Sequence, residues 1–234
     1  DLEKIKNSRP LSKIELQELR KSLWVMFVQN SNAIEWNTYT LWETKLLLED
    51  WITVWWKTLK EQNEVLNHRE LLSILYNFLE KDIQINEDLV LKIHKNVLKN
   101  IDNESSGVYR KIQNYISWDD LIPPKALDVP KLMNKLIFDL NNDLKNNKKN
   151  IVQIVWNFHY DFAKIHPFID WNGRTIRLLV NMILMKNWFP MIIIPNIRRW
   201  EYISNLSSYK TKNDFLVFFA DIVLQNLRDY MIMI

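Results

Sequence analysis

Apolar residues recur at helical spacing along almost the whole chain. Between Leu11 and Gln29, leucine, isoleucine, valine and methionine side chains return every three or four residues, which is the period of an α-helix with one buried face. Ser12 and Thr40 are placed as N-caps, and Glu43 stands three residues after Thr40 in capping-box position. The pattern predicts helices over 11–29, 40–50, 61–81, 86–100, 130–146, 151–165, 174–187, 199–209 and 213–230.

One stretch departs from the helical period. Val108, Tyr109, Ile112 and Tyr115 are β-forming residues that follow Gly107, so we predict a short β-hairpin over 107–118. A Pro-Pro pair then breaks the chain. Because neither an internal repeat nor a clear linker is present, we expect one all-α unit with one small β-hairpin.

The composition is that of a globular protein, with 47% hydrophobic and 25% charged residues. A net charge of +3 is too small to indicate a nucleic-acid or membrane-binding surface. The chain has no cysteine, which excludes disulfides, thiol catalysis and cysteine-ligated metals. Its apolar stretches are too short to span a bilayer, and no basic-then-apolar signal opens it. We therefore expect a cytoplasmic protein that binds neither membranes nor, directly, nucleic acid.

Tryptophan is unusually frequent and glycine unusually rare. The chain has 11 tryptophans and 2 glycines, whereas average usage would give roughly 16 glycines. Trp188 follows a predicted helix and precedes Phe189-Pro190, a position that usually holds a glycine in the left-handed conformation. Trp51 follows another helix, and Trp55-Trp56 lies between two helices. A bulky side chain resists positive φ by roughly 1–2 kcal/mol per site.

We hypothesise a common cause, namely that a codon read as glycine in the source has been written as tryptophan. The lysine-, asparagine- and isoleucine-rich composition is compatible with an AT-rich gene of that kind. The alternative is that these are genuine tryptophans that fill a core. The hypothesis covers Trp36, Trp51, Trp55, Trp56, Trp171 and Trp188, and leaves Trp24, Trp42, Trp118, Trp156 and Trp200 undecided.

The stretch HPFIDWNGRTIR, residues 166–177, carries the candidate chemistry. Pro167 disfavours helical geometry at His166, so the preceding helix ends there and the histidine lies in a loop. Asp170 offers a hard carboxylate oxygen that suits Mg²⁺. A histidine and a carboxylate in one loop can supply a general base and a metal ligand.

The second half of this stretch opens a helix. Asn172 and Gly173 precede a turn whose free backbone N–H groups form an anion site. Arg174 and Arg177 are three residues apart, so both can face the same anion. On spacing alone the stretch is either a polyphosphate site with its own base, or a buried histidine cap beside a surface arginine pair.

These residues resemble the signature of the Fic family, His-x-Phe-x-Asp/Glu-Gly-Asn-Gly-Arg-x-x-Arg. Each fixed position matches except one, where Trp171 replaces the glycine. Upstream, the SNAIE segment, residues 31–35, resembles the inhibitory motif Ser/Thr-x-x-x-Glu, with Trp36 in place of the expected glycine. The stretch 107–116 resembles the flap that aligns the target segment, and the NWFPMIII ending after the catalytic helix is also family-like.

The resemblance implies a Fic-type helical bundle with a small β-hairpin flap. Residues 1–60 would form an N-terminal helical segment with the inhibitory motif, and 61–234 the Fic core domain, packed as one globular unit. It also implies an autoinhibited protein adenylyltransferase, which transfers AMP from Mg-ATP to a Ser, Thr or Tyr hydroxyl of a target protein.

The resemblance assigns roles by position. His166 would be the general base, and Asp170 would hold Mg²⁺ at the nucleotide phosphates. Glu35, in the motif that begins at Ser31, would pair with Arg177 and block productive placement of ATP. The anion hole and the phosphate contacts would come from the backbone at Trp171 and from Asn172, Gly173, Arg174 and Arg177.

Activity is conditional on position 171, because an indole would fill space that the phosphates need. A genuine Trp171 favours a catalytically silent Fic module that binds a nucleotide or a partner protein. A third reading is a Fic enzyme that uses another phosphate donor, or that removes AMP with Glu35 positioning a water. His68, His94 and His159 are expected to be packed structural residues. The target, the modified residue type, homodimer formation and a trimmed C-terminal domain stay open.

Overall fold

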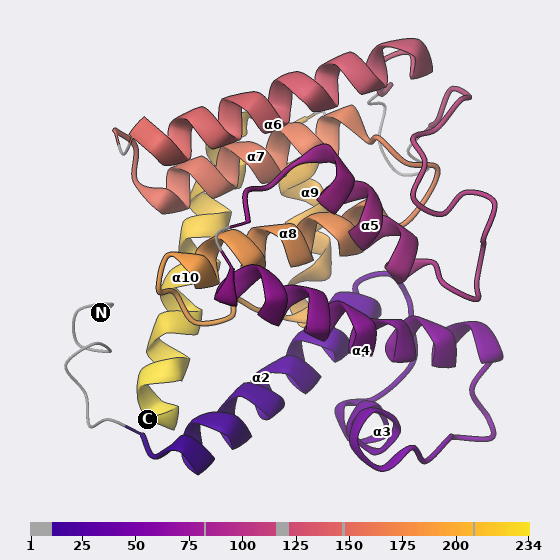
Figure 1. Ribbon diagram of the computed structural model, residues 1–234, viewed down its shortest axis with the longest axis vertical. Helices are drawn as coiled ribbons and strands as arrows, with labels where there is room; N and C mark the ends of the chain where they lie inside the picture. Colours follow the sequence, from indigo (N-terminus) through magenta and orange to yellow (C-terminus); the bar gives the residue numbers. More distant parts are fainter. Residues whose placement is uncertain (1–10, 82, 116–121, 147, 208) are drawn as a thin grey trace.

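The computed structural model describes residues 11–81, 83–115, 122–146, 148–207 and 209–234, which fold into a bundle of helices (Figure 1). The all-α prediction is confirmed, and the observed helices overlap the predicted ones along the chain. The longer helices are α2 Lys13–Ala33, α3 Leu41–Lys45, α4 Leu59–Glu80, α5 Glu87–Val97, α6 Val129–Asn146, α7 Ile151–Ile165, α8 Asn172–Lys186, α9 Arg199–Leu206 and α10 Lys212–Met233.

Capping side chains fix where several helices begin. Ser12 accepts a hydrogen bond from the Glu15 N–H (3.2 Å), and the Glu15 carboxylate accepts one from the Ser12 N–H (2.8 Å). The same reciprocal box starts α3 at Thr40, so both predicted caps are confirmed. The helix predicted over 40–50 is confirmed in its bounds, and its second half, Leu46–Asp50, is one turn of π-helix.

The predicted hairpin over 107–118 was also wrong for the residues described there, 107–115, which contain no strand; 116–118 lie outside the described residues. Polar groups of this segment bond to the loop after α7 and do not form the ladder of a hairpin. The Arg110 N–H donates to the Pro167 carbonyl (3.0 Å), and the Asn114 amide donates to the Ile169 carbonyl (2.9 Å). The segment is therefore fastened to the loop that carries the HPFID residues.

Helix α8 occupies the centre of the molecule. It crosses the middle of the view in Figure 1 and packs against α2, α4, α5 and α7. Each of the residues from Arg174 to Leu184 is buried. A helix that is buried all round normally carries apolar residues only, so the two arginines near its start need partners inside the protein.

Four tryptophans have a left-handed backbone, and all four belong to the group for which glycine was hypothesised. Their φ angles are 68° at Trp36, 60° at Trp51, 57° at Trp171 and 68° at Trp188. At the end of α8 the Trp188 N–H donates to the Met185 carbonyl and the next N–H donates to the Leu184 carbonyl, both at 3.1 Å. These two bonds define the helix stop that usually places glycine at the left-handed position.

The other tryptophans do not share this conformation in the part of the chain that is described. Trp55 and Trp56 lie in a turn closed by a bond from the Lys57 N–H to the Val54 carbonyl (3.0 Å), but neither has positive φ. The backbone argument for glycine was therefore wrong at these two positions. Of the undecided tryptophans, Trp24 and Trp156 are buried in the core, Trp42 and Trp200 are exposed within helices, and Trp118 lies outside the described residues.

Among the described helices, none combines the length and the apolarity that crossing a bilayer requires.

Replacing Trp188 by glycine is expected to raise the free energy of unfolding by about 1 kcal/mol, since it relieves a left-handed φ. The indole is 78% exposed, so little buried area is lost. The matched control is Trp42→Gly, at a similarly exposed tryptophan inside α3, which is expected to lower the free energy of unfolding by about 0.5–1 kcal/mol. Urea titrations of both variants measure the free energy of unfolding. If Trp188→Gly lowers it as much as Trp42→Gly does, the left-handed backbone at Trp188 is not strained.

Candidate functional site

The loop between α7 and α8 begins at His166, as predicted. His166 is the C-cap of α7, with a left-handed backbone (φ 49°, ψ 62°) and an N–H that donates to the Phe162 carbonyl (3.0 Å). The Arg110 Nε donates to the His166 carbonyl (2.8 Å). The backbone of this histidine is thus held from both sides while its side chain lines a pocket.

The rest of the loop is closed by one amide side chain. The Asn172 Oδ1 accepts from the Phe168 N–H and the Asn172 Nδ2 donates to the Phe168 carbonyl, both at 2.9 Å. Because both ends of this side chain are occupied, Asn172 shapes the loop with its amide. What it offers to a ligand is the backbone N–H at the start of α8.

His94 fastens the same loop from α5. Its ring stacks on Phe168, with 3.6 Å between the ring centroids and 5° between the planes. The Gly107 N–H donates to His94 Nδ1 (3.0 Å), so in the neutral ring Nε2 carries the proton and donates to the Asp170 carbonyl (3.1 Å). Burial lowers the pKa of His94 to about 4, which keeps it neutral at physiological pH.

The N-terminus of α8 is covered by the SNAIE segment. The Glu35 carboxylate lies 2.9 Å from Arg177 Nη2, and Ser31 accepts from the same guanidinium through its hydroxyl (3.0 Å) and its carbonyl (2.8 Å). A Cβ at Gly173 would collide with the Glu35 carboxylate and lie 2.8 Å from Arg177 Nη1. Glycine at 173 therefore lets this ion pair lie directly on the backbone of the first turn.

The charges around this turn are paired and mostly buried. Burial alone would raise the pKa of Glu35, but Arg177 and then Arg174 outweigh it and hold that pKa below its ordinary value. Arg174 lies 3.3 Å from the Glu64 carboxylate of α4, and both side chains are 5% exposed. Sequence reasoning did not single out Glu64, because one carboxylate in an amphipathic helix gives no signal.

A pocket of about 150 Å³ lies between these groups. His166, Asp170, Arg174, Arg177 and Glu35 all line it, so the structure brings together the loop, the helix N-terminus and the SNAIE segment. Small-molecule pockets are usually about 300–1,000 Å³. The cavity is smaller than that range. The Glu35 carboxylate and the Arg177 guanidinium take up the space next to Gly173, and the buried indole of Trp171 also lines the cavity.

Trp171 is the N-cap residue of α8 and offers no side-chain cap. The centroid of its ring lies 5.4 Å from the Arg174 guanidinium and 5.2 Å from the Lys60 ammonium. Its indole Nε1 has no hydrogen-bond partner among the described residues. The indole thus contacts both cations, and one of them, Arg174, lines the same pocket.

Two groups of the loop are suited to proton and metal chemistry. Burial, followed by the charge of Arg110, lowers the pKa of His166 to about 4, so its imidazole is neutral and able to accept a proton at pH 7. Asp170 is exposed at the rim. No cluster of three or more histidine, aspartate or glutamate residues suited to a metal occurs among the described residues. A single carboxylate fits Mg²⁺, which usually keeps several waters and binds through one or two carboxylates plus substrate phosphates.

Comparison with known protein families finds one match in this region. A model described as the Fic/DOC family covers residues 84–184. Curated relatives that match the chain carry the name protein adenylyltransferase Fic. The chain is 35% identical over 204 residues to that of Nematostella vectensis, and 32% identical over 218 residues to that of Drosophila grimshawi. These alignments cover 86% and 92% of this chain but 46% and 44% of the relatives, so the chain spans less than half of their length.

Solved structures agree with this match. A Fic-domain-containing signalling protein from Bacteroides thetaiotaomicron has a TM-score of 0.86 at 25% identity, covering 95% of this chain and 91% of that one. Fic-1 from C. elegans has a TM-score of 0.84 at 28% identity, covering 100% and 69%.

Glu64→Gln is expected to lower the free energy of unfolding by about 3–5 kcal/mol, because it leaves the Arg174 charge buried without its counter-charge. The control is Glu70→Gln. Glu70 pairs with Lys99 on the surface, with both side chains about half exposed, so the loss there is expected to be at most about 1 kcal/mol. Denaturant titrations compare the two variants, and similar small losses would mean that the Arg174–Glu64 pair does not stabilise the fold.

Proposed function

Because this chain belongs to the Fic/DOC family, we propose that it is an autoinhibited protein adenylyltransferase whose activity requires glycine at position 171. The observation that carries the proposal is the convergence of a neutral histidine, a helix N-terminus and two arginines on one pocket that Glu35 partly fills. The naming of the relatives as adenylyltransferases supports the same activity.

The proposed reaction transfers AMP from ATP to a Ser, Thr or Tyr hydroxyl of a target protein. The hydroxyl oxygen forms a bond to the α-phosphorus while the bond between that phosphorus and the α–β bridging oxygen breaks. Pyrophosphate leaves, and His166 accepts the hydroxyl proton. Backbone N–H groups at the start of α8, together with Arg174 and Arg177, stabilise the phosphate charge, as in related phosphoryl transfers.

Asp170 is the residue that would hold Mg²⁺ in this scheme, and the ion would neutralise charge on the nucleotide phosphates. The exposed position of Asp170 at the pocket rim supports this assignment. The residues of the chain supply the positioning and the proton acceptor.

Autoinhibition follows from the place of Glu35. The carboxylate lies against Gly173 and pairs with Arg177, so it takes both the space and the cation that the γ-phosphate needs. The low pKa of Glu35 keeps it charged at physiological pH. Since the pair is retained above that pKa and lost only as the pH falls through it, pH changes between 6 and 8 do not relieve the inhibition.

Position 171 decides between two candidate functions. The left-handed backbone, and an indole Nε1 without a hydrogen-bond partner among the described residues, support glycine as the encoded residue, which would open the phosphate site. The buried indole in the pocket favours the second candidate, a catalytically silent module, if tryptophan is genuine. The intact mass of the natively expressed protein distinguishes the two.

The expected outcome for Trp171→Gly combined with Glu35→Gly is labelling of protein from ATP radiolabelled at the α-phosphate, at least tenfold faster than with Trp171→Gly alone. Freeing Arg177 is expected to favour the reactive pose by about 1.4 kcal/mol or more. Adding His166→Ala to the double variant removes the base and is expected to lower the rate about 10²–10⁴-fold. If Glu35→Gly does not accelerate labelling, the SNAIE segment is not inhibitory; if no variant that carries Trp171→Gly labels protein, the silent module is favoured.

The low pKa of His166 predicts the pH profile of the Trp171→Gly, Glu35→Gly double variant. A base with a pKa of about 4 is already unprotonated at pH 6, so kcat/KM for ATP is expected to be flat between pH 6 and 8 and to fall only as the pH approaches about 4. Initial rates across that range measure it. An acid limb near pH 6.5 would show that the His166 pKa is not lowered in the free enzyme.

A further inference from the structure

We propose that Tyr202, supported by His159, is a positioning residue that holds Arg177 for the nucleotide after the SNAIE segment has moved away. This inference rests on the proposed function, because it assigns Arg177 to the phosphates of ATP. Tyr202 is on α9 and His159 is on α7, and neither belongs to the HPFIDWNGRTIR stretch.

The hydrogen bonds that Arg177 donates from its guanidinium all reach the inhibitory segment in the part of the chain described. Nε donates to the Ser31 hydroxyl, and Nη2 donates to the Ser31 carbonyl and the Glu35 carboxylate. Release of this segment would remove all three. The remaining group, Nη1, is buried and has no hydrogen-bond partner among the described residues. Without another neighbour, the buried guanidinium would lose its orientation whenever the inhibition is lifted.

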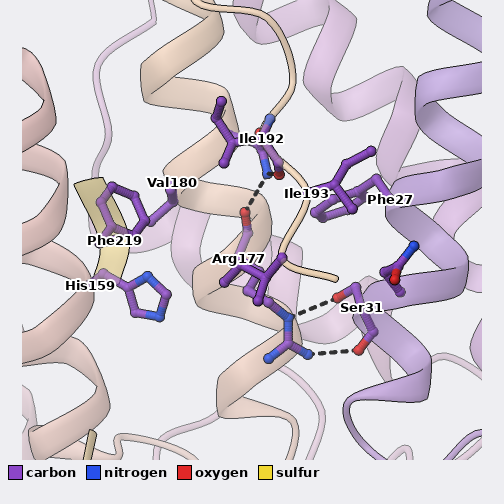
Figure 2. Close-up of a pocket in the computed structure, with 11 residues that line it drawn as sticks. Phe27, Ser31, His159, Arg177, Val180, Ile192, Ile193 and Phe219 are labelled. Atoms are coloured by element: carbon purple, nitrogen blue, oxygen red, sulfur yellow. Dashed lines mark hydrogen bonds between the residues drawn. The ribbon is translucent and has the colours of Figure 1, made fainter. Parts of the chain in front are cut away.

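Tyr202 is that neighbour on the core side. The Arg177 Cζ lies 5.8 Å from the centroid of the Tyr202 ring, and both residues line the candidate pocket. Burial lowers the pKa of Arg177, and Glu35 and the Tyr202 hydroxyl outweigh it, so the hydroxyl oxygen favours the charged guanidinium. Figure 2 shows Arg177 between Ser31 of α2 on one side and His159 of α7 on the other.

His159 fixes the direction of the Tyr202 hydroxyl. Its Nε2 lies 2.9 Å from the Tyr202 oxygen, and burial, followed by the charge of Arg177, lowers the pKa of His159 to about 3, so the ring is neutral. A guanidinium has donors only. The Tyr202 oxygen can therefore serve Arg177 only as an acceptor. In the His159 tautomer with Nε2 unprotonated, the Tyr202 hydroxyl donates its proton to Nε2, and its oxygen keeps lone pairs for Arg177. We assign this tautomer to the Tyr202–His159 dyad.

The dyad is built into the rigid core. Both side chains are almost fully buried, and the His159 ring makes edge contacts with Phe215 and Phe219, whose centroids lie 5.0 and 5.9 Å away. The dyad therefore stays in place when α2 moves. Two sets of partners hold Arg177, one that blocks ATP and one that remains for catalysis.

The test is a double-mutant cycle in the Trp171→Gly, Glu35→Gly background. Tyr202→Phe is combined with Arg177→Ala, and both ATP binding by calorimetry and the KM for ATP in the labelling assay are measured. We expect Tyr202→Phe to weaken ATP binding and raise the KM about tenfold when Arg177 is present, because the hydroxyl oxygen is the acceptor proposed for the charged guanidinium once the inhibitory segment has moved away. No further change is expected when Arg177 is replaced by alanine, because Tyr202 acts through it.

Matched variants separate positioning from a general loss of structure. Tyr39→Phe removes the hydroxyl of an equally buried tyrosine outside the pocket and is expected to leave the KM unchanged. His159→Phe keeps an aromatic ring between Phe215 and Phe219 but removes the acceptor, and is expected to reproduce the effect of Tyr202→Phe. His159→Gln, whose amide oxygen can accept the hydroxyl proton, is expected to raise the KM for ATP less than His159→Phe does.

The outcomes are distinguishable from those that test the function. The positioning role would be overturned if Tyr202→Phe weakened ATP binding equally with and without Arg177, or if it left the KM unchanged with Arg177 present. The adenylyltransferase assignment would stand in either case. If the Trp171→Gly, Glu35→Gly variant binds ATP but labels no protein, the calorimetric double-mutant cycle still tests the positioning role of Tyr202. A background protein that binds no ATP overturns both.

Discussion

Two guanidinium groups buried near the start of the central helix are the constraint on which the rest of the site depends. A charge removed from water is tolerated only with a counter-charge and with hydrogen bonds. The chain supplies them from distant segments: Glu64 of α4 reaches Arg174, and Ser31 and Glu35 reach Arg177. The packing of α2 and α4 on α8 is therefore coupled to the electrostatics of the pocket, and moving the SNAIE segment changes both.

Much of the fold was predictable from the sequence because the apolar period and the capping residues are local signals. The Ser12 and Thr40 caps and the helix end at His166 follow from interactions within a few residues. The hairpin over 107–118 was not predictable in this way. Its β-forming side chains are a local preference, whereas the described part of the segment bonds to a loop more than fifty residues away. Long-range partners of this kind have no signature in a single sequence.

The same division holds for the candidate site. The residues of the HPFIDWNGRTIR stretch could be singled out because their spacing has a direct chemical meaning, and those of SNAIE because they resemble the inhibitory motif of the Fic family. Glu64, Tyr202 and His94 could not, since each becomes relevant only through a contact made by folding. The left-handed positions were partly predictable: a helix stop before Phe-Pro located Trp188, but the turn at Trp55 and Trp56 forms without positive φ.

Arg110 gives the site a mechanical property that follows from its partners. Its guanidinium donates to the carbonyls of Ile165 and His166 at the end of α7, and also to those of Ile112 and Pro124 on its own side. This one side chain therefore holds the end of α7 and the segment that carries Arg110 in a fixed relative position. Under the proposed function, a target peptide bound along 107–115 would be positioned by the same arginine that holds the His166 backbone. The distance between that peptide and the imidazole would then be set by a single side chain.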